Sequence, residues 1–507
     1  MSTSPTADDP TRPQPLHRTV DVVVLGMGSG GEHVAHKLLD AGLEVAGVEA
    51  GLVGGECPFW GCTPSKLLIR SADALAEARR AGHLAGDVDV RRPDLGPAAA
   101  RVREANHDWD DEAHAGPLLG KGLDLVRGHG RLEGRDADGA VRVRVTTTGG
   151  GSDSDTDTVL LTARRGVVLN TGTEPAVPPV EGLAGTPYWT NRDAVALTAA
   201  PDSVVVLGGG PIGAELTQVL ARFGSRTTLV ETEPRLLGPE EPEAGDLLAD
   251  VLRTEGVDVR TGTTLTRVAH GDGGFTCTLV ADHGGDEDGD EDGGEATVTA
   301  DHLLVATGRR PLLDDLGLET VGLDPAAATV PVDPRCRSAA EGVWAVGDIT
   351  GEGAFTSVAL YQGALVVQDL LGTATGGPDT HPEEWGDYRA VARATFTDPE
   401  VGAVGLTEAQ AREAGIDVVT AIADVGRDSR GWIHGAHGLI KVVADREAGV
   451  LVGATAVSPA GGEVIGLFTT AVHARVPVAT LSRMHLAYPT FHRTARVVLA
   501  KLGEAGV

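Results

Sequence analysis

Short apolar runs that end in glycine-rich turns recur along the chain and predict alternating strands and helices. Residues 20–31, VDVVVLGMGSGG, have the pattern of a buried strand that enters a turn, and residues 32–50 continue with a helix and a second short strand. The same order returns at residues 203–213, SVVVLGGGPIG, followed by a helix and a strand over residues 214–231. The pattern predicts an α/β fold in which one strand–turn–helix unit is used twice.

The rest of the chain divides into segments that differ in composition and in the pattern of apolar residues. Residues 71–105 are rich in Ala and Arg and predict helix, and residues 141–148 and 158–172 alternate as strands around the polar turn 149–157. From about residue 388 the strands and helices lack glycine turns of the nucleotide type. We therefore expect a disordered tail at 1–19, a first dinucleotide-binding domain at 20–160 completed by 301–385, a second at 161–300, and a C-terminal domain at 388–507.

An acidic low-complexity run occupies residues 283–295, HGGDEDGDEDGGE, between two strand-like pieces. Its alternating aspartates resemble a calcium loop, but the twelfth loop position is Thr299 instead of Glu, and no helices flank the run. We expect a disordered loop tip with no metal site.

Composition narrows the class of partner. The chain has 507 residues, of which 41% are hydrophobic, so a sizeable core can form. Lys and Arg number 42 against 73 Asp and Glu, and aromatic residues make up 3%. The net charge of −31 disfavours nucleic acid and anionic membranes as partners. No apolar run reaches the ~18 residues of a membrane helix, and we expect a cytoplasmic protein.

The two glycine clusters carry specific chemistry. The clusters are Gly26, Gly28 and Gly31, and Gly208, Gly210 and Gly213. In each, the first glycine allows a tight turn, the second lets the backbone approach a pyrophosphate, and the third lets helix and strand pack closely. Glu49 and Glu231 close the following strands at the same spacing and can accept hydrogen bonds from a ribose diol. Two such sites predict electron transfer between FAD and a nicotinamide. Glu231 favours NADH over NADPH, although Arg226 and Arg235 are near enough in sequence to weaken that preference.

Two of the four cysteines, Cys57 and Cys62, lie in GGECPFWGCTPSK between the glycine clusters. A thiolate at the start of a helical stretch gains from the helix dipole and a nearby cation. Spacing alone leaves a structural disulfide open, but a position after an FAD turn favours a redox-active pair. Cys277 and Cys336 have no partner at useful spacing and are expected to be inert buried thiols.

With these motifs the chain resembles the pyridine nucleotide-disulfide oxidoreductases, the family of lipoamide dehydrogenase, glutathione reductase and mercuric reductase. The resemblance also rests on NTGTEP from Asn170, ATGRRP from Ala306, AVGDITG from Ala345 and FTDPEVGAVGLTE from Phe396. It implies two Rossmann-like domains, for FAD and NAD, and a C-terminal α/β dimerisation domain. Because the family builds each active site from two subunits, it also implies a homodimer.

The resemblance assigns roles to individual residues. Cys62 would lie against the flavin as a charge-transfer thiolate, Cys57 would exchange with the substrate, and Lys66 would lie near flavin N5. The implied FAD contacts are Gly26, Gly28, Gly31, Glu49, Lys66, Gly130, Thr171, Gly172, Asp348 and Thr356. The implied NAD contacts are Gly208, Gly210, Gly213, Glu231 and Gly308. Gly130 and Gly308 could equally be turn residues.

The C-terminal motif departs from the family pattern. Disulfide-reducing members carry a His-Pro followed three residues later by Glu, whereas the matching stretch here is AYPTFHRTAR. Tyr488 stands at the histidine position and Arg493 at the glutamate position. A phenol is a poorer proton shuttle than an imidazole at neutral pH. Tyr488 or His492 could replace the missing acid, or the acceptor could need little proton help.

We therefore expect an NAD(P)H-dependent flavoprotein disulfide oxidoreductase that passes electrons from NADH through FAD and Cys57–Cys62 to a small acceptor, such as a lipoamide-like disulfide. Two alternatives stay open. One is a diaphorase that reduces a quinone or a metal ion; mercury is doubtful, because the last cysteine is Cys336 and no C-terminal pair follows. The other is a flavin-bound redox sensor without turnover. Phe59 and Trp60, between the cysteines, would either narrow access to the thiol or pack in the core.

Overall fold

The computed structural model describes residues 16–86, 89, 93–148, 158–281, 295–372 and 385–507. They group into two units, one comprising Met1–Cys57, Trp109–Glu174 and Pro311–Gly386, the other comprising Pro58–Asp108, Pro175–Arg310 and Asp387–Val507. Most of the expected tail, the turn at 149–157 and nearly all of the acidic run lie outside the described residues.

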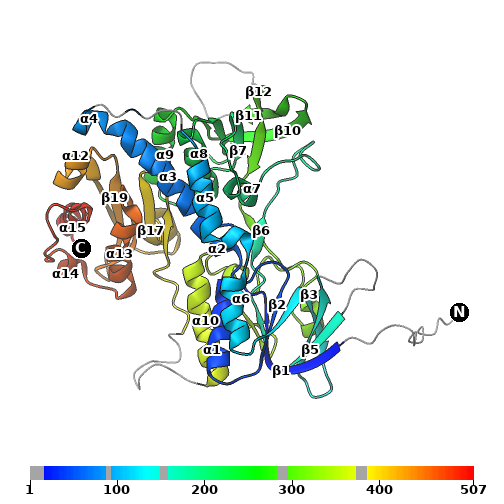
Figure 1. Ribbon diagram of the computed structural model, residues 1–507. Coiled ribbons are helices and arrows are strands. Elements are labelled where there is room, and N and C mark those ends of the chain that lie inside the picture. Colours follow the sequence, from blue (N-terminus) through cyan, green and yellow to red (C-terminus); the bar gives the residue numbers. More distant parts are fainter. Residues whose placement is uncertain (1–15, 87–88, 90–92, 149–157, 282–294, 373–384) are drawn as a thin grey trace. The chain divides into compact units, whose positions relative to one another are not determined.

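A six-stranded sheet organises the first unit (Figure 1). Strand β1 lies parallel to both β2 and β5, while β4 runs antiparallel to β3 and β5. The strands are β1 (Leu16–Leu25), β2 (Val45–Glu49), β3 (Asp124–Arg135), β4 (Val141–Thr147), β5 (Thr158–Leu169) and β15 (Val343–Ala345). Helices α1 (Ser29–Asp40) and α10 (Thr356–Leu371) pack against each other, and the unit also contains α6 (Glu112–Gly120).

Strand β1 begins four residues earlier than the expected domain start at Val20. Leu16 to Thr19 pair in register with the beginning of β5, so they belong to the sheet and not to the tail. Further along, Val22, Val23 and Val24 are fully buried. An unbroken apolar run is what a parallel strand covered on both faces requires.

Within the described residues, three sheets lie entirely in the second unit. A parallel sheet has the order β13-β7-β8-β9, an antiparallel sheet the order β10-β11-β12, and a five-stranded sheet the order β16-β17-β20-β19-β18. The first two contain β7 (Ser203–Leu207), β8 (Arg226–Val230), β9 (Asp258–Arg260), β10 (Thr263–Gly271), β11 (Gly274–Ala281), β12 (Glu295–Ala300) and β13 (His302–Val305). The third contains β16 (Ala392–Thr395), β17 (Glu400–Gly405), β18 (Val418–Asp424), β19 (Leu439–Asp445) and β20 (Val450–Ser458). Short strands β6 (Thr173–Pro175) and β14 (Arg309–Pro311) lie where the chain passes between the units.

The helices of the second unit flank these sheets. They are α3 (Cys62–Arg80), α4 (Gly82–Ala85), α5 (Gly96–Ala105), α7 (Asn191–Val195), α8 (Pro211–Arg222), α9 (Pro242–Thr254), α11 (Glu408–Glu413), α12 (Ser429–His434), α13 (Gly461–His473), α14 (Val478–Leu481) and α15 (Ala495–Glu504). The expected helix over 71–105 is thus divided between three helices. Gly86, which has a φ of +93°, stands directly after α4 and ends that helix in a backbone conformation that favours glycine.

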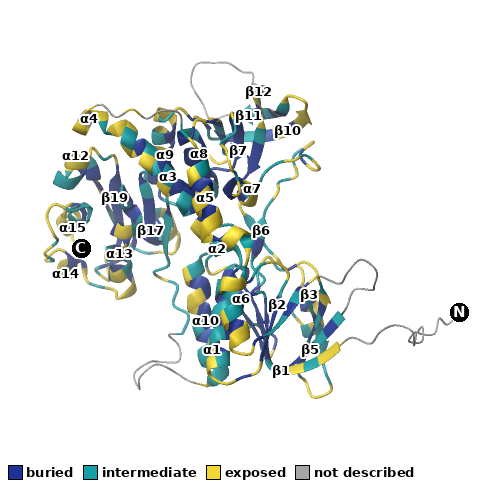
Figure 2. Ribbon diagram, in the orientation of Figure 1, coloured by how far each residue is buried: buried dark blue, intermediate teal, exposed yellow. Residues whose placement is uncertain are grey.

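The central strands β7 and β20 and the second half of β1 are almost wholly buried, whereas β10 and β12 carry many exposed residues (Figure 2). Two strand–turn–helix units recur, β1–α1 in the first unit and β7–α8 in the second. The α/β fold class expected from the sequence is confirmed. Within the described residues no helix is long and apolar enough to cross a membrane.

Candidate functional site

The first glycine cluster forms the turn between β1 and α1. Gly26 has a φ of +95°, and a Cβ there would stand 2.2 Å from the carbonyl oxygen of Asn170, so only glycine fits. A Cβ on Gly31 would stand 2.1 Å from the carbonyl oxygen of Gly26, which explains the close packing of helix and turn. Gly28 is the N-cap of α1, and no side chain of the described residues caps that helix. The uncapped N–H groups fit a pyrophosphate.

Glu49 ends β2 beside this turn. Its carboxylate accepts hydrogen bonds from the backbone N–H groups of Met27 and Gly51, both at 2.7 Å. Burial raises the pKa of Glu49, while these donors and the charge of Arg127 oppose the shift. The backbone therefore fixes the carboxylate where the sequence predicts the FAD ribose.

The remaining predicted FAD residues also belong to the first unit, with the exception of Lys66. Asp348 accepts a hydrogen bond from the Thr173 hydroxyl at 2.9 Å, and the Thr171 hydroxyl donates to the Leu312 carbonyl at 2.8 Å. Gly130 lies inside β3 and not in a turn, and a Cβ there would stand 2.2 Å from a terminal methyl of Leu25, which would have to move. The other members are Gly172, directly before β6, and Thr356, the first residue of α10.

The second glycine cluster repeats this geometry between β7 and α8. Gly208 has a φ of +106°, and a Cβ on Gly213 would stand 1.8 Å from the Gly208 carbonyl oxygen. Gly210 is the N-cap of α8, and among the described residues no atom lies within 4 Å of the place of a Cβ. The second glycine thus leaves room for a pyrophosphate, and the residues present fit a second dinucleotide.

Glu231 directly follows β8 and accepts hydrogen bonds from the N–H groups of Gly209 at 2.5 Å and Glu233 at 2.8 Å. Arg226 is the first residue of β8 and lies at the opposite end of that strand. Five extended residues span about 13 Å, which separates Arg226 from Glu231. Arg235, the other arginine that is near in sequence, follows Glu231 in the segment before α9, and its effect on the NADH preference stays a prediction. Gly308 has a φ of +104°, and its carbonyl accepts a hydrogen bond from the N–H of Ala176.

The two cysteines of the predicted redox pair lie at the starts of successive helices. Cys57 is half-buried in α2 (Glu56–Phe59), and Cys62 is exposed as the first residue of α3. Phe59 is only 1% exposed, which favours packing over a role in narrowing access to the thiol. The Trp60 carbonyl accepts a hydrogen bond from the Asn191 amide at 2.9 Å.

Lys66 lies on α3 one helical turn after Cys62 and points to α8. Its Nζ donates to Glu215 Oε2 at 2.8 Å and lies 4.7 Å from the centre of the Phe396 ring. The Glu215 side chain is 5% exposed, and its second oxygen accepts from the N–H of Phe396 at 2.8 Å. Sequence reasoning missed Glu215. A carboxylate among the buried residues of α8 was the signal that could have found it.

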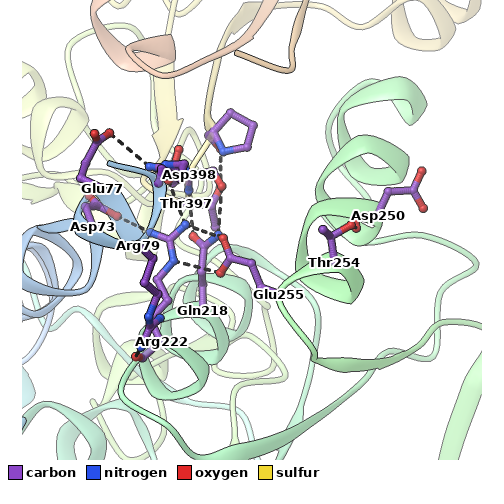
Figure 3. Close-up of polar contacts among 12 residues, drawn as sticks. Asp73, Glu77, Arg79, Gln218, Arg222, Asp250, Thr254, Glu255, Thr397 and Asp398 are labelled. Atoms are coloured by element: carbon purple, nitrogen blue, oxygen red, sulfur yellow. Dashed lines mark hydrogen bonds and ion pairs between the residues drawn. The ribbon is translucent and has the colours of Figure 1, made fainter. Parts of the chain in front are cut away.

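A buried arginine holds the same two helices together farther along (Figure 3). The Arg222 side chain, at the end of α8, is 2% exposed and pairs with three carboxylates. They are Asp73 of α3 at 2.7 Å, Glu255 at the end of α9 at 2.6 Å, and Asp398 before β17 at 2.9 Å. The cluster fixes α3, which carries Cys62 and Lys66, against the domain with the second glycine turn.

Asp73 and Asp398 respond differently to this environment. Burial raises the pKa of Asp73 to about 6, although Arg222 opposes the shift. Burial also acts on Asp398, but the charges of Arg222 and Arg80 hold its pKa below the usual range. Asp73 therefore adds stability at low pH that is lost as the pH rises through about 6, whereas Asp398 adds stability that is lost on acidification.

The C-terminal candidates lie in the five-stranded part of the second unit. Tyr488 is 66% exposed, and its hydroxyl donates to Ser429 Oγ at 3.0 Å. His492 is half-buried in the short 3-10 helix Phe491–Thr494. Arg493, at the glutamate position of the family pattern, pairs with Asp428 at 3.0 Å. Asp428 and Ser429 were not foreseen from the sequence.

Cys277 and Cys336 are both fully buried, as expected. Burial raises the pKa of the Cys277 thiol to about 11, so it stays protonated at neutral pH.

Comparison with known proteins agrees with this geometry. Residues 20–363 match the pyridine nucleotide-disulphide oxidoreductase family, and residues 391–497 match the dimerisation domain of that family. The chain is 33% identical over 478 residues to a mercuric reductase of Streptomyces lividans, covering 94% of both chains. It is 30% identical over 484 residues to a dihydrolipoyl dehydrogenase of Chlorobaculum tepidum, covering 94% of this chain and 95% of the relative. The crystal structure of LpdA from Mycobacterium tuberculosis superposes with a TM-score of 0.78 at 26% identity, covering 96% of this chain and 99% of that one.

The chain belongs to the class I pyridine nucleotide-disulfide oxidoreductases. The expected class of enzyme, an NAD(P)H-dependent flavoprotein disulfide oxidoreductase with FAD as cofactor, is confirmed. So is the expected architecture of FAD- and NAD-binding domains with a C-terminal dimerisation domain. The roles of individual residues and the domain boundaries stay predictions.

Proposed function

We propose that the protein oxidises NADH and reduces a small disulfide through Cys62 and Cys57. The observation that carries this proposal is the position of Cys62 at the start of α3, one turn before the Lys66–Glu215 pair. When bound, FAD supplies two-electron chemistry between the nicotinamide and the sulfur pair. Lys66, anchored by a buried carboxylate, holds a positive charge on the face of α3 that also carries Cys62.

The sulfur chemistry follows thiol–disulfide exchange. Reduced Cys57 attacks the acceptor disulfide, forms a mixed disulfide and releases one acceptor sulfur as a thiolate, which takes up a proton. Cys62 then attacks Cys57, restores the Cys57–Cys62 bond and releases the second acceptor thiol. NADH supplies the two electrons that return the pair to its dithiol form.

The direct test is NADH oxidation in the steady state with lipoamide as acceptor. Sustained turnover supports the proposal. A single reduction without cycling, across disulfides, quinones and metal ions, would identify a flavin-bound redox sensor instead.

A diaphorase that reduces a quinone or a metal ion is the second candidate. It is favoured by Tyr488 and Arg493, which replace the residues that protonate a departing thiolate in the disulfide-reducing members. The similarity to mercuric reductases suits it, although residues 337–507 contain no cysteine that could bind mercury. Turnover with a quinone that exceeds turnover with lipoamide would favour this candidate.

We also propose that NADH is the preferred nicotinamide, because the Glu231 carboxylate would repel a 2′-phosphate. Replacing Glu231 with Gln keeps an acceptor for the Gly209 N–H but removes the charge. The ratio of kcat/KM for NADPH to that for NADH should rise about tenfold. Asp202→Asn, an exposed change before β7 at the other edge of the sheet, is the matched control. Equal ratios in the two variants would refute this role of Glu231.

A cytoplasmic homodimer is the expected form. It is supported by the match to the dimerisation domain and by large apolar side chains that α12 exposes, among them Trp432 at 77% and Ile433 at 52%. The cytoplasm also supplies NADH and keeps thiols reduced. Sedimentation at micromolar concentration should give the mass of two chains, and a monomer would refute the dimer.

A further inference from the structure

Tyr488 is held by side chains that sequence reasoning did not connect with it. The Tyr488 hydroxyl donates to Ser429 Oγ at 3.0 Å. The guanidinium carbon of Arg493 lies 5.0 Å from the centre of the Tyr488 ring, within the range of a cation–π contact. One residue from α12 and one from the 3-10 helix Phe491–Thr494 therefore fix the ring from two sides.

Asp428 anchors this arrangement. Its side chain is 7% exposed and accepts hydrogen bonds from Arg493 Nη1 at 3.0 Å, from the Ser429 N–H at 2.7 Å and from the Thr494 hydroxyl at 3.3 Å. A carboxylate that is buried to this degree holds its partners firmly, because an unpaired buried charge is costly. Asp428 thus orients both Ser429 and Arg493, the two side chains that contact Tyr488.

Packing does not account for the support given to Tyr488. Tyr488 is 66% exposed, and Asp428 and Arg493 are among the residues that line a pocket of about 750 Å³. Because the ring is exposed and its hydroxyl is held in place, Tyr488 can contact another molecule that binds at this surface.

We propose that Arg493, anchored by Asp428, is a positioning residue that orients Tyr488 to protonate the thiolate released from the acceptor. This inference rests on the proposed disulfide reduction. In the step, the Tyr488 O–H bond breaks, an S–H bond forms on the departing sulfur, and the phenolate takes a proton back from water. The guanidinium faces the negative charge that develops on Tyr488. The charges are opposite to those of a histidine–glutamate pair, in which a carboxylate faces a cationic ring.

The first test compares two half-reactions in the variant Arg493→Gln. With lipoamide as acceptor, kcat should fall about tenfold while KM changes less than about twofold, because positioning acts on the transition state. Reduction of the bound flavin by NADH and turnover with ferricyanide should stay unchanged. Arg493→Lys, which keeps the cation but not its planar face, should recover part of the lost kcat. Arg430→Gln is the matched control, since Arg430 lies over Phe491 and not over Tyr488.

The second test uses Asp428→Asn. Asparagine caps a helix as well as aspartate does, so α12 keeps its cap while the ion pair with Arg493 is lost. The double variant with Arg493→Gln should be no slower than the slower single variant, because both changes break one unit. Equal turnover of lipoamide by wild type, Tyr488→Phe and Arg493→Gln would overturn the proposal. The proposal would also be overturned if Arg493→Gln lost turnover with ferricyanide to the same degree as turnover with lipoamide. If lipoamide is not reduced by the wild type at all, the proposed function itself fails.

Discussion

Replacing Cys57 with Ser is expected to lower NADH-dependent reduction of lipoamide at least about 1,000-fold, because the thiol that forms the mixed disulfide is lost. Cys57 is half-buried in the short helix α2, and serine is nearly isosteric, so the fold should survive. Turnover with ferricyanide, which takes electrons from flavin directly, should persist. Steady-state rates with both acceptors give the comparison.

The buried thiol Cys277 provides the control for this experiment. It is fully buried in β11, and its raised pKa keeps it protonated, so Cys277→Ala should leave both rates unchanged. Undiminished turnover of Cys57→Ser with lipoamide would contradict the sulfur relay and favour the diaphorase.

Replacing Arg222 with Met should lower the free energy of unfolding by about 3–5 kcal/mol, since it leaves three carboxylates near each other without their shared cation. Folded proteins are stable by only about 5–15 kcal/mol, so this is a large fraction of the total. Denaturation by urea, followed by circular dichroism, measures the effect.

Two controls separate the buried cation from a general effect of charge removal. Arg253→Met removes an exposed arginine that pairs with Asp250 on α9, and should change stability by less than about 0.5 kcal/mol. Asp73→Asn removes the carboxylate whose pKa burial raises to about 6, while keeping an acceptor for Arg222. Its stability relative to wild type should improve by about 1–2 kcal/mol between about pH 4 and pH 7. Equal losses in Arg222→Met and Arg253→Met would contradict the role of the cluster.

The dinucleotide-binding features could be predicted from the sequence because they are local. The turn at Gly26 and the turn at Gly208 each depend on a strand, a glycine and a helix that follow one another in the chain. Glu49 and Glu231 then take their places because each ends or directly follows the next strand of a parallel sheet. The redox loop was found for the same reason.

The partners of these residues could not be predicted, because they come from distant parts of the chain. Lys66 pairs with Glu215, Arg222 with Asp73, and no local pattern links either pair. Arg226 shows that nearness in sequence, conversely, does not bring two residues together in space. It is close to Glu231 in sequence, but a strand carries it to the opposite edge of the sheet.

The most direct test of the central claim is an anaerobic titration of the purified protein with NADH. The sulfur relay predicts that the first two electrons yield a long-wavelength absorption band, as expected for a thiolate of Cys62 beside FAD. In Cys57→Ser, which cannot form the disulfide, the first two electrons should not be taken up by the sulfur pair. Direct bleaching of the flavin by the first equivalent of NADH, with no long-wavelength band and no change in either cysteine, would contradict the account.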